Sequence, residues 1–522
     1  MLSSLRLHLI PIKLKTTYRS IKRSRTTQLF LLVTLLHYFT QTVVQSGLFT
    51  LDQNAQSISS QILSAAKVPK GHFAWLTRDN SDFTLQLCSH VPEGKNINAC
   101  VKVFETGTQP IPILNGFRKR DDMATMGNVA VAMNTTMDGN GNVLVNFPGM
   151  DVMTLDQQCT RVLIYADQVL RNSKREELAL IGSEVWLLGI SIFALAFCSI
   201  PHLVAGFFFR MLSTGWSAYA IWRTQDIHIR FNALISGPQG ACGGAELFPS
   251  YFHDRLLWQV PDLVLNLVML LASSVLVWRL CRDYKTLMFT RVGAPENVVR
   301  IYRYFLGVFV CLQLSVFLVL ASIALWIDQL MNGAIAHIST HTTIYDALFI
   351  STVILLLPWI YMGWRSVRGE HTRTLIAFFT TAFVLFACWA IMYYSMVYRW
   401  TWLQWPFFAS LTVASQLVLG FSIPLGYMCW RNFGQGLKQY LIADAVLENL
   451  DFEPEFFDVE KPSRPPSFAD MKSTLYLENE PSFVDAATGY ELRNNDTWSV
   501  IAVSPPAAYR SNGRERVPSG YI

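Results

Sequence analysis

Residues Glu184 to Trp222 read EVWLLGISIFALAFCSIPHLVAGFFFRMLSTGWSAYAIW, an apolar run of about 39 residues. A single tilted helix needs only about 20 such residues to cross a hydrocarbon core about 30 Å thick. The run is therefore too long for one span, and Pro201 and His202 near its middle mark a turn. The pattern predicts two antiparallel helices, Glu184–Ser199 and Leu203–Trp222.

Further apolar segments follow the split run, and each is long enough to span a bilayer. They are Trp258–Trp278, Tyr304–Trp326, Tyr345–Trp364, Thr374–Tyr394 and Phe407–Trp430. Together with the two helices above, they predict a mainly α membrane protein with a seven-helix transmembrane domain over residues 183–430. Composition agrees, because hydrophobic residues make up 52% of the chain and charged residues only 15%, whereas soluble domains carry about 25% charged residues.

The distribution of positive charge predicts the orientation of these helices. Short cytosolic loops are enriched in Lys and Arg. Splitting the run places the loops Arg279–Arg303 and Arg365–Arg373, with six and three positive side chains, in the cytosol. It places Asp328–Thr343, which has none, outside. The expected outward loop Arg223–Leu257 is the exception, because it contains three arginines.

The N-terminal region begins with a basic leader at residues 1–27 and an apolar segment, Gln28–Ser46. A basic stretch can bind nucleic acid, but this one leads directly into an apolar segment, so we expect the positive flank of a membrane segment and no nucleic-acid partner. Gln28–Ser46 could be a cleaved signal peptide or a retained signal anchor. The long leader favours the anchor.

Residues 47–182 are more polar and are predicted to form a small extracytoplasmic β-sandwich. The turn sequence Asp138–Gly141 lies between two apolar runs and indicates a hairpin. Asn134 begins an Asn-Thr-Thr sequon, which predicts N-glycosylation in the lumen. The expected strands are Phe83–Leu87, Ala99–Phe104, Asn128–Met133, Asn142–Phe147 and Arg161–Ala166.

Four of the nine cysteines, Cys88, Cys100, Cys159 and Cys242, lie outside the membrane in this topology. An even set in an oxidising compartment is compatible with two disulfides, although four cysteines allow three connectivities. The short spacing favours pairing Cys88 with Cys100, which would leave Cys159 for Cys242. Buried free thiols are the alternative.

Residues 431–522 are predicted to form a cytosolic, largely disordered tail. A short helix at Leu437–Leu450 is expected near its start. The tail is rich in Pro, Ser, Asn and Gly beyond that helix, and it lacks the apolar residues needed for a core of its own. Ser467 follows Arg-Pro-Pro, a pattern similar to a basophilic kinase site. A cytosolic adaptor is a possible partner of this tail.

Three ionisable residues fall inside or near predicted spans, where charges are rare and often functional. Arg210 could pair with Asp262 on the next helix or extend to the cytosolic surface, and its shallow predicted depth favours the surface. Asp262 and Asp346 could each line an outward cavity or cap a helix near the interface. The pair His337 and His341 provides only two metal ligands, so we expect no metal site.

Signatures of enzymes are missing from the sequence. It has no Gly-x-Ser-x-Gly, no phosphate-binding Gly-Lys-Ser/Thr loop, no paired Cys-x-x-Cys and no series of histidine boxes. We therefore expect no catalytic residues, no enzymatic activity and no cofactor.

Four pieces of the chain resemble a family of multi-pass membrane proteins of basidiomycete fungi, which includes the smut-fungus "protein involved in tumours" membrane protein. They are Gly215–Arg223, Leu247–Phe252, Val292–Glu296 and Tyr398–Pro406. The order of signal or anchor, outer β domain, seven helices and disordered tail also resembles the Golgi-dynamics-domain seven-helix proteins, which include Wntless-like cargo receptors. These resemblances imply a fungal cell-surface or secretory-route protein that contributes to virulence.

The leading functional hypothesis is a seven-helix receptor-like protein or cargo receptor whose outer domain binds an unknown ligand or cargo. Its expected location is the plasma membrane or the Golgi and endosomal membranes, with the N-terminal domain lumenal or extracellular and the C-terminus cytosolic. The alternatives are a small-molecule transporter and a membrane scaffold. Few polar groups are expected to line the helices, which argues against the transport of ions.

The topology predicts that a glycosidase will shift the mobility of a protein whose single intact sequon is at Asn134. Protease protection should find a tag placed after Trp222 in the lumen and a tag in the tail in the cytosol. A cytosolic tag after Trp222 would mean that Glu184–Trp222 crosses the membrane only once.

Overall fold

The computed structural model describes residues 24–68, 71–79, 82–91, 99–106, 133–139, 141–147, 152–292, 295–333, 335 and 342–449. The chain divides into two units, Met1–Pro454 and Glu455–Ile522. The second unit, the expected phosphorylation site Ser467 and the expected adaptor-binding tail all lie outside the described residues. Everything below concerns the first unit.

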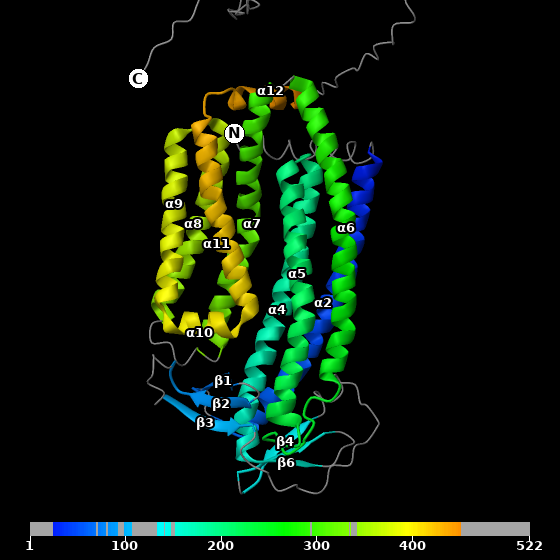
Figure 1. Ribbon diagram of the computed structural model, residues 1–522, viewed down its shortest axis with the longest axis vertical. Helices are drawn as coiled ribbons and strands as arrows, with labels where there is room; N and C mark the ends of the chain where they lie inside the picture. The colour runs from blue at the N-terminus through cyan, green and yellow to red at the C-terminus, as the bar shows by residue number, and fades with distance from the viewer. Residues whose placement is uncertain are drawn as a thin grey trace, which may run out of the picture. The chain divides into compact units, whose positions relative to one another are not determined.

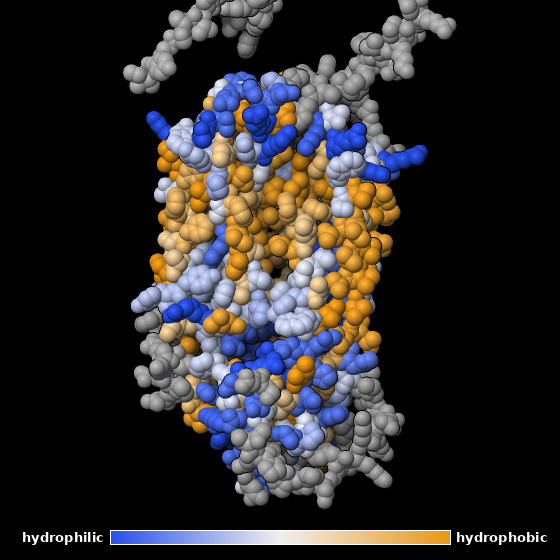
Figure 2. Space-filling model, viewed as in Figure 1, coloured by the Kyte–Doolittle hydropathy of each residue, from blue (hydrophilic) through white to orange (hydrophobic). Residues whose placement is uncertain are grey.

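Seven helices in the described part of the chain are long and apolar enough to cross a membrane. Figure 2 shows a broad apolar band over these helices with hydrophilic residues at both ends. The protein is therefore a multi-pass membrane protein, and it contacts a lipid bilayer. The seven helices are α2 (Arg25–Ala65), α4 (Gln157–Ala196), α6 (Tyr251–Val292), α7 (Glu296–Asn332), α8 (Thr342–Gly369), α9 (Thr372–Tyr394) and α11 (Pro406–Arg431).

The long apolar run is broken in two, as predicted, but its second half is not one of the seven candidate spans, and α2 is counted in its place. Helix α4 ends at Ala196, and α5 (Ile200–Phe231) starts after a three-residue turn in which Cys198 has a left-handed backbone, with φ of 45°. Pro201 occupies the first turn of α5, where its missing N–H breaks no helical bond. Because the connection is so short, α4 and α5 are antiparallel neighbours, and α5 runs beside α4 and α6 (Figure 1).

The predicted end of this second helix at Trp222 is wrong, because α5 continues to Phe231 and is followed by a π-helical turn, η2 (Asn232–Ser236). A topology tag is therefore better placed after Gly237 than after Trp222. The helix expected at Glu184–Ser199 ends three residues earlier, at Ala196, and the expected spans from Trp258 onward lie inside helices that extend beyond them at one or both ends. The short α10 (Met396–Gln404) and α12 (Leu437–Asn449) lie at opposite ends of the bundle (Figure 1), and α12 matches the expected short helix.

The helices form two groups of four. Helices α2, α4, α5 and α6 pack on one another, as do α7, α8, α9 and α11, and the groups meet where α4 and α5 contact α7. The second group surrounds an apolar core in which the large side chains Trp326, Trp359, Phe378 and Phe408 are fully buried. The first group differs, because its apolar clusters lie toward its two ends and polar side chains fill the length between them.

The end of the protein that the sequence predicts to face outward, called the outer part below, contains two three-stranded antiparallel sheets, ordered β1-β2-β3 and β4-β5-β6. The expected strands at residues 83–87, 99–104 and 142–147 correspond to β2, β3 and β5, and the turn at Asp138–Gly141 joins β4 to β5 as predicted. The strands are β1 (Phe73–Asp79), β2 (Asp82–Cys88), β3 (Cys100–Glu105), β4 (Asn134–Met137), β5 (Val143–Asn146) and β6 (Met153–Leu155).

The expected strand at Arg161–Ala166 is wrong, because these residues belong to the first turns of α4. Asp156 caps this helix by accepting a hydrogen bond of 2.7 Å from the amide of Cys159. Residues 162–166 form a short apolar run, and such a run fits a buried helix as well as a buried strand. Of the strand expected at residues 128–133, only Met133 is described, and it precedes β4.

The outer part is not a separate β domain. Helix α2 has 41 residues and α4 has 40, so each is about 60 Å long, roughly twice the thickness of the hydrocarbon core. Their ends project into the outer part, where Ile58, Ile62 and Val162 share one core with Phe83 and Val143 from the two sheets. The expected sandwich is therefore replaced by sheets that pack against helices.

Two disulfides tie the outer part together, and their pairing agrees with the expected one. Cys88 and Cys100 join β2 to β3, where they are register partners. Cys159 and Cys242 join the first turn of α4 to the connection between η2 and α6, across 83 residues of sequence. The second bond therefore constrains the position of α4 relative to the α5–α6 pair.

Loss of the Cys159–Cys242 bond should destabilise the protein more than loss of Cys88–Cys100, because their sequence separations are 83 and 12 residues. Loop-closure entropy gives about 4.5 kcal/mol for the longer loop and about 3 kcal/mol for the shorter one. The measurement is the thermal unfolding of the two double Cys→Ser variants of the purified protein. A larger loss for the Cys88→Ser/Cys100→Ser variant would contradict this assignment.

Candidate buried charge network and outer cleft

Polar side chains line the interior of the first helix group at helical spacing. His37, Gln41 and Gln45 are four residues apart on α2, and Arg255 and Gln259 on α6 are also four apart. This spacing places each set on one helix face. Among the described residues, the second helix group buries hydroxyls and amides but no charged side chain. The buried charged and amide residues of the first group are His37, Gln41, Gln45, Asp52, Asp167, Arg175, Glu176, Glu177, Glu184, Arg210, Arg255, Gln259, Asp262 and Asn266.

Arg255 joins three helices. Its Nη1 donates to the Asp52 carboxylate on α2 and, at 2.9 Å, to the hydroxyl of Tyr251. Its Nη2 donates to Glu177 Oε1 on α4 at 3.1 Å. Tyr251 in turn donates to Asp52 at 2.7 Å. Because all four side chains are buried, this cluster holds α2, α4 and α6 in one register.

Asp262 is buried inside the bundle, where it lines a small cavity between helices instead of capping a helix at the interface. Its Oδ1 accepts hydrogen bonds from the amide nitrogens of Gln41 and Gln45, the second at 2.6 Å. Asn266, one turn further along α6, donates to the backbone carbonyl of Asp262 at 3.1 Å. The Asp262 carboxylate therefore binds α6 to α2.

Arg210 is also buried, with only 6% of its surface exposed, so the expected extension to the cytosolic surface is wrong. The charge that acts on it is that of Glu184 on α4, and it forms no ion pair with Asp262, the alternative considered from the sequence. Glu184 also lies 3.7 Å from the ring of His37. The position of a residue along a spanning helix indicates its depth in the membrane but not the side to which its side chain points. On α5, the side chain of Arg210 points toward the interior of the bundle. Asp346 lies in the first turns of α8, and its side chain is outside the described set.

Glu176 connects the two helix groups. It accepts a hydrogen bond of 2.5 Å from Arg223 on α5 and one of 2.7 Å from the indole nitrogen of Trp405, which precedes α11. Both Glu176 and Trp405 are buried. This contact joins α4 to the second group at the outer end of the bundle.

Sequence reasoning missed most of these residues because it assigned them to other structures. Asp52 and Glu177 fell within the expected outer domain, and Arg223 and Arg255 counted as outward-loop charges that disagreed with the topology. Arg223 pairs with Glu176, Arg230 with Asp226, and Arg255 with Asp52 and Glu177. The positive charges in that region are therefore neutralised by ion pairs. The sequence feature that could have revealed this network is the four-residue spacing of the polar residues on α2.

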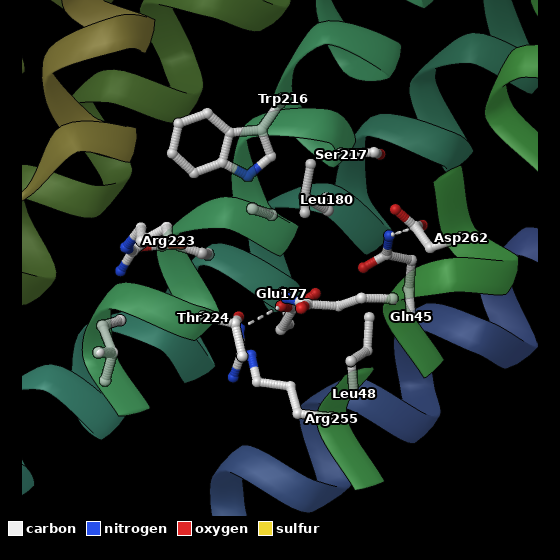
Figure 3. A pocket seen from close by; sticks show the side chains of 14 residues that line it. Gln45, Leu48, Glu177, Leu180, Trp216, Ser217, Arg223, Thr224, Arg255 and Asp262 are labelled. Atoms are coloured by element: carbon white, nitrogen blue, oxygen red, sulfur yellow. Dashed lines mark hydrogen bonds and ion pairs between the residues drawn. The ribbon is translucent and has the colours of Figure 1, made fainter. Parts of the chain in front are cut away.

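A small cavity lies within this network, between α2, α4, α5 and α6 (Figure 3). Gln45, Glu177, Gln259 and Asp262 are among the side chains that line it. The cavity has a volume of ≈ 20 Å³, which is enough for about one water molecule.

A much larger cleft of ≈ 580 Å³ opens between the outer part and the second helix group. One wall comes from the ends of α2 and β1 and from α4, and the opposite wall from the end of α7 and from α10. Positively charged and aromatic side chains are prominent in it. They include Lys67, Arg171, Arg175, Trp400 and Trp405, together with the carboxylate of Asp167.

Polar contacts bridge the two walls of this cleft. Arg171 donates to the carbonyl of Asn332 at the end of α7 at 2.7 Å and pairs with Asp167 at 2.7 Å. Arg175 pairs with Asp328 and donates to Gln329, both on α7. The position of α4 relative to α7 therefore depends on groups that also face the cleft.

The remaining expected sites receive no structural role. Asn134 is exposed on β4, and its glycosylation stays a prediction. His337 and His341 lie outside the described residues. Within those residues, no three His, Cys, Asp or Glu side chains come together in a way that could hold a metal ion.

No protein-family model matches this chain, and no curated protein or solved structure shows significant similarity to it. The class of protein is defined by the structure itself: a multi-pass membrane protein with a buried charge network and an outer cleft.

Replacing Arg255 by Met should destabilise the protein by about 3 to 5 kcal/mol, because Asp52 and Glu177 lose their shared counter-charge inside the bundle. The shift in thermal unfolding of the detergent-purified variant measures this effect. Adding Asp52→Asn and Glu177→Gln to Arg255→Met should restore much of the lost stability, because no unpaired charge then remains. A single variant as stable as the natural protein would show that the cluster has no structural role.

Proposed function

We propose that this protein is a receptor-like membrane protein that binds a ligand or cargo segment in its outer cleft. The observation that carries the proposal is the cleft itself, which has ≈ 580 Å³ and walls from both the outer part and the second helix group. This volume lies within the range of about 300 to 1,000 Å³ that is typical of ligand sites. A ligand placed there would contact both parts at once.

The chemistry of the cleft favours an acidic ligand or an acidic cargo segment. Lys67, Arg171 and Arg175 line it, and Asp167 is the carboxylate among its lining residues. Guanidinium groups bind carboxylates and phosphates in a bidentate geometry. Trp400 adds an aromatic surface against which the apolar part of such a ligand can pack.

Helix α4 connects the cleft directly to the buried charge network inside the helix bundle. Arg171 and Arg175 face the cleft, and Glu176 and Glu177 follow at once in the buried network. A ligand that binds better to one arrangement of α4 and α7 would shift the protein toward that arrangement. The bridges from Arg171 and Arg175 to α7 are the contacts that such a shift would change.

We also propose that the outer part is lumenal or extracellular and the tail cytosolic, at the plasma membrane or in Golgi and endosomal membranes. Two disulfides support this orientation, because they form in oxidising compartments. Gln28–Ser46 acts as a retained anchor in this proposal, because Gln41 and Gln45 bind Asp262. The resemblance to fungal membrane proteins and to seven-helix cargo receptors supports a role in the secretory route and in virulence.

An ion-coupled transporter is the second candidate function. The observation that favours it is the buried charge network, which is far more polar than the sequence led us to expect. Buried ionisable groups in membrane helices often mark ion or proton pathways. Uptake of a substrate into proteoliposomes, dependent on Glu184 and Asp262, would support this function.

The receptor proposal predicts that a photo-reactive amino acid at Gln404 will crosslink a specific partner in living cells. Gln404 is an exposed residue of the cleft, so the replacement should not disturb folding. The same probe at Gln53, which is exposed on α2 and does not line the cleft, should yield no such adduct. Mass spectrometry of the adducts is the measurement.

Filling the cleft provides the control. Ser64 lines the cleft and is exposed, so Ser64→Trp should abolish the Gln404 adduct, whereas Gln53→Trp should leave it unchanged. A captured cargo should also fail to reach its normal location in cells that lack the receptor. Equal adducts at Gln404 with and without Ser64→Trp would show that the cleft is not the binding site.

A further inference from the structure

The small cavity in the buried network contains oxygen atoms that have no hydrogen-bond donor. Gln45 Oε1, Glu177 Oε2 and Gln259 Oε1 are buried and accept no hydrogen bond from another protein atom. Each of the three side chains lines the cavity, and each is only 3 to 4% exposed. Leaving a buried acceptor without a partner costs about 1 to 3 kcal/mol, so a bound group is expected there.

The orientation of these side chains is consistent with a bound group between them. Figure 3 shows Gln45 and Asp262 on one side of the cavity and Glu177 near its centre. The amide nitrogen of Gln45 is used by Asp262, which leaves the amide oxygen of Gln45 for another partner. Glu177 likewise uses one carboxylate oxygen for Arg255 and leaves the other unpaired.

The charges around the cavity do not balance. Three carboxylates, Glu176, Glu177 and Asp262, line it with two guanidinium groups, Arg223 and Arg255. This leaves one net negative charge. Asp52 adds a further carboxylate to this network, because it shares Arg255 with Glu177.

We propose that this cavity binds one monovalent cation of about the size of sodium, held by oxygen atoms of Gln45, Glu177, Gln259 and Asp262. Hard cations prefer carboxylate and amide oxygens, and the oxygens of Gln45, Glu177 and Gln259 described above lack hydrogen-bond partners. The space holds about one water-sized sphere, which fits a single dehydrated ion. A single positive charge also reduces the excess negative charge of the network.

The proposed cation would stabilise the packing of three helices, because its ligands come from α2, α4 and α6. It would do so without any ligand in the outer cleft, so this inference does not depend on the proposed receptor function. Any ligand that binds only the folded state raises the unfolding temperature as its concentration rises. Sodium should therefore stabilise the purified protein in a saturable way.

The test compares the thermal unfolding of the purified full-length protein in sodium chloride and in choline chloride, at equal ionic strength and constant pH. Choline is too large for the cavity, so it controls for ionic strength. We expect sodium to raise the unfolding temperature by roughly 4 °C or more at saturation. Binding of radioactive sodium to the unmodified protein provides a second, direct measurement.

Gln259→Leu removes one of the four proposed ligand oxygens without changing the charge, and it should abolish the sodium effect while leaving stability in choline nearly unchanged. Gln416→Leu is the matched control, because Gln416 is half-buried on α11 and does not line the cavity. It should keep the full response to sodium. Equal stability in sodium and choline together with no bound sodium would overturn the proposal, as would stability that depends on pH alone.

Discussion

The shared ion pair of Arg255 with Asp52 and Glu177 is the constraint on which the rest of the first helix group depends. Removing one member of a buried cluster leaves a charge in a medium that cannot solvate it, which costs far more than the pairs gain. The three helices can therefore pack in only one register. The cavity, the outer cleft and the contact of Glu176 with Trp405 all follow from where that register places α4.

The two helix groups achieve stability in different ways. The second group buries aromatic and aliphatic side chains such as Trp359 and Phe378, and such a core tolerates small displacements. The first group buries paired charges and amides, whose hydrogen bonds require a fixed geometry. Helix α4 contacts α7 of the second group while it belongs to the first. Movement at the outer cleft would therefore first change the buried charge network of the first group, whose geometry is less able to adjust.

The spans, the break at Pro201, the hairpin after Met137 and the disulfides could be predicted from sequence, because each depends on local chemistry or on simple counting. The strand expected at Arg161–Ala166 could not be distinguished from a helix, because a run of five apolar residues fits both. The burial of Arg210 was missed because hydropathy reports depth and not the direction of a side chain. His37 and Gln41, which made the first apolar segment look short, are part of the buried polar face of α2.

The polar face of α2 also has a consequence for how the protein is made. Gln41 is synthesised 221 residues before its partner Asp262, which at about 5 to 20 residues per second is a delay of roughly 10 to 45 seconds. During that interval α6 does not yet exist, so the Gln41 and Gln45 amides of α2 cannot donate to Asp262. Until α6 is made, α2 therefore carries polar groups without the side chains that stabilise them in the folded protein, a cost of membrane insertion that its apolar content alone does not indicate.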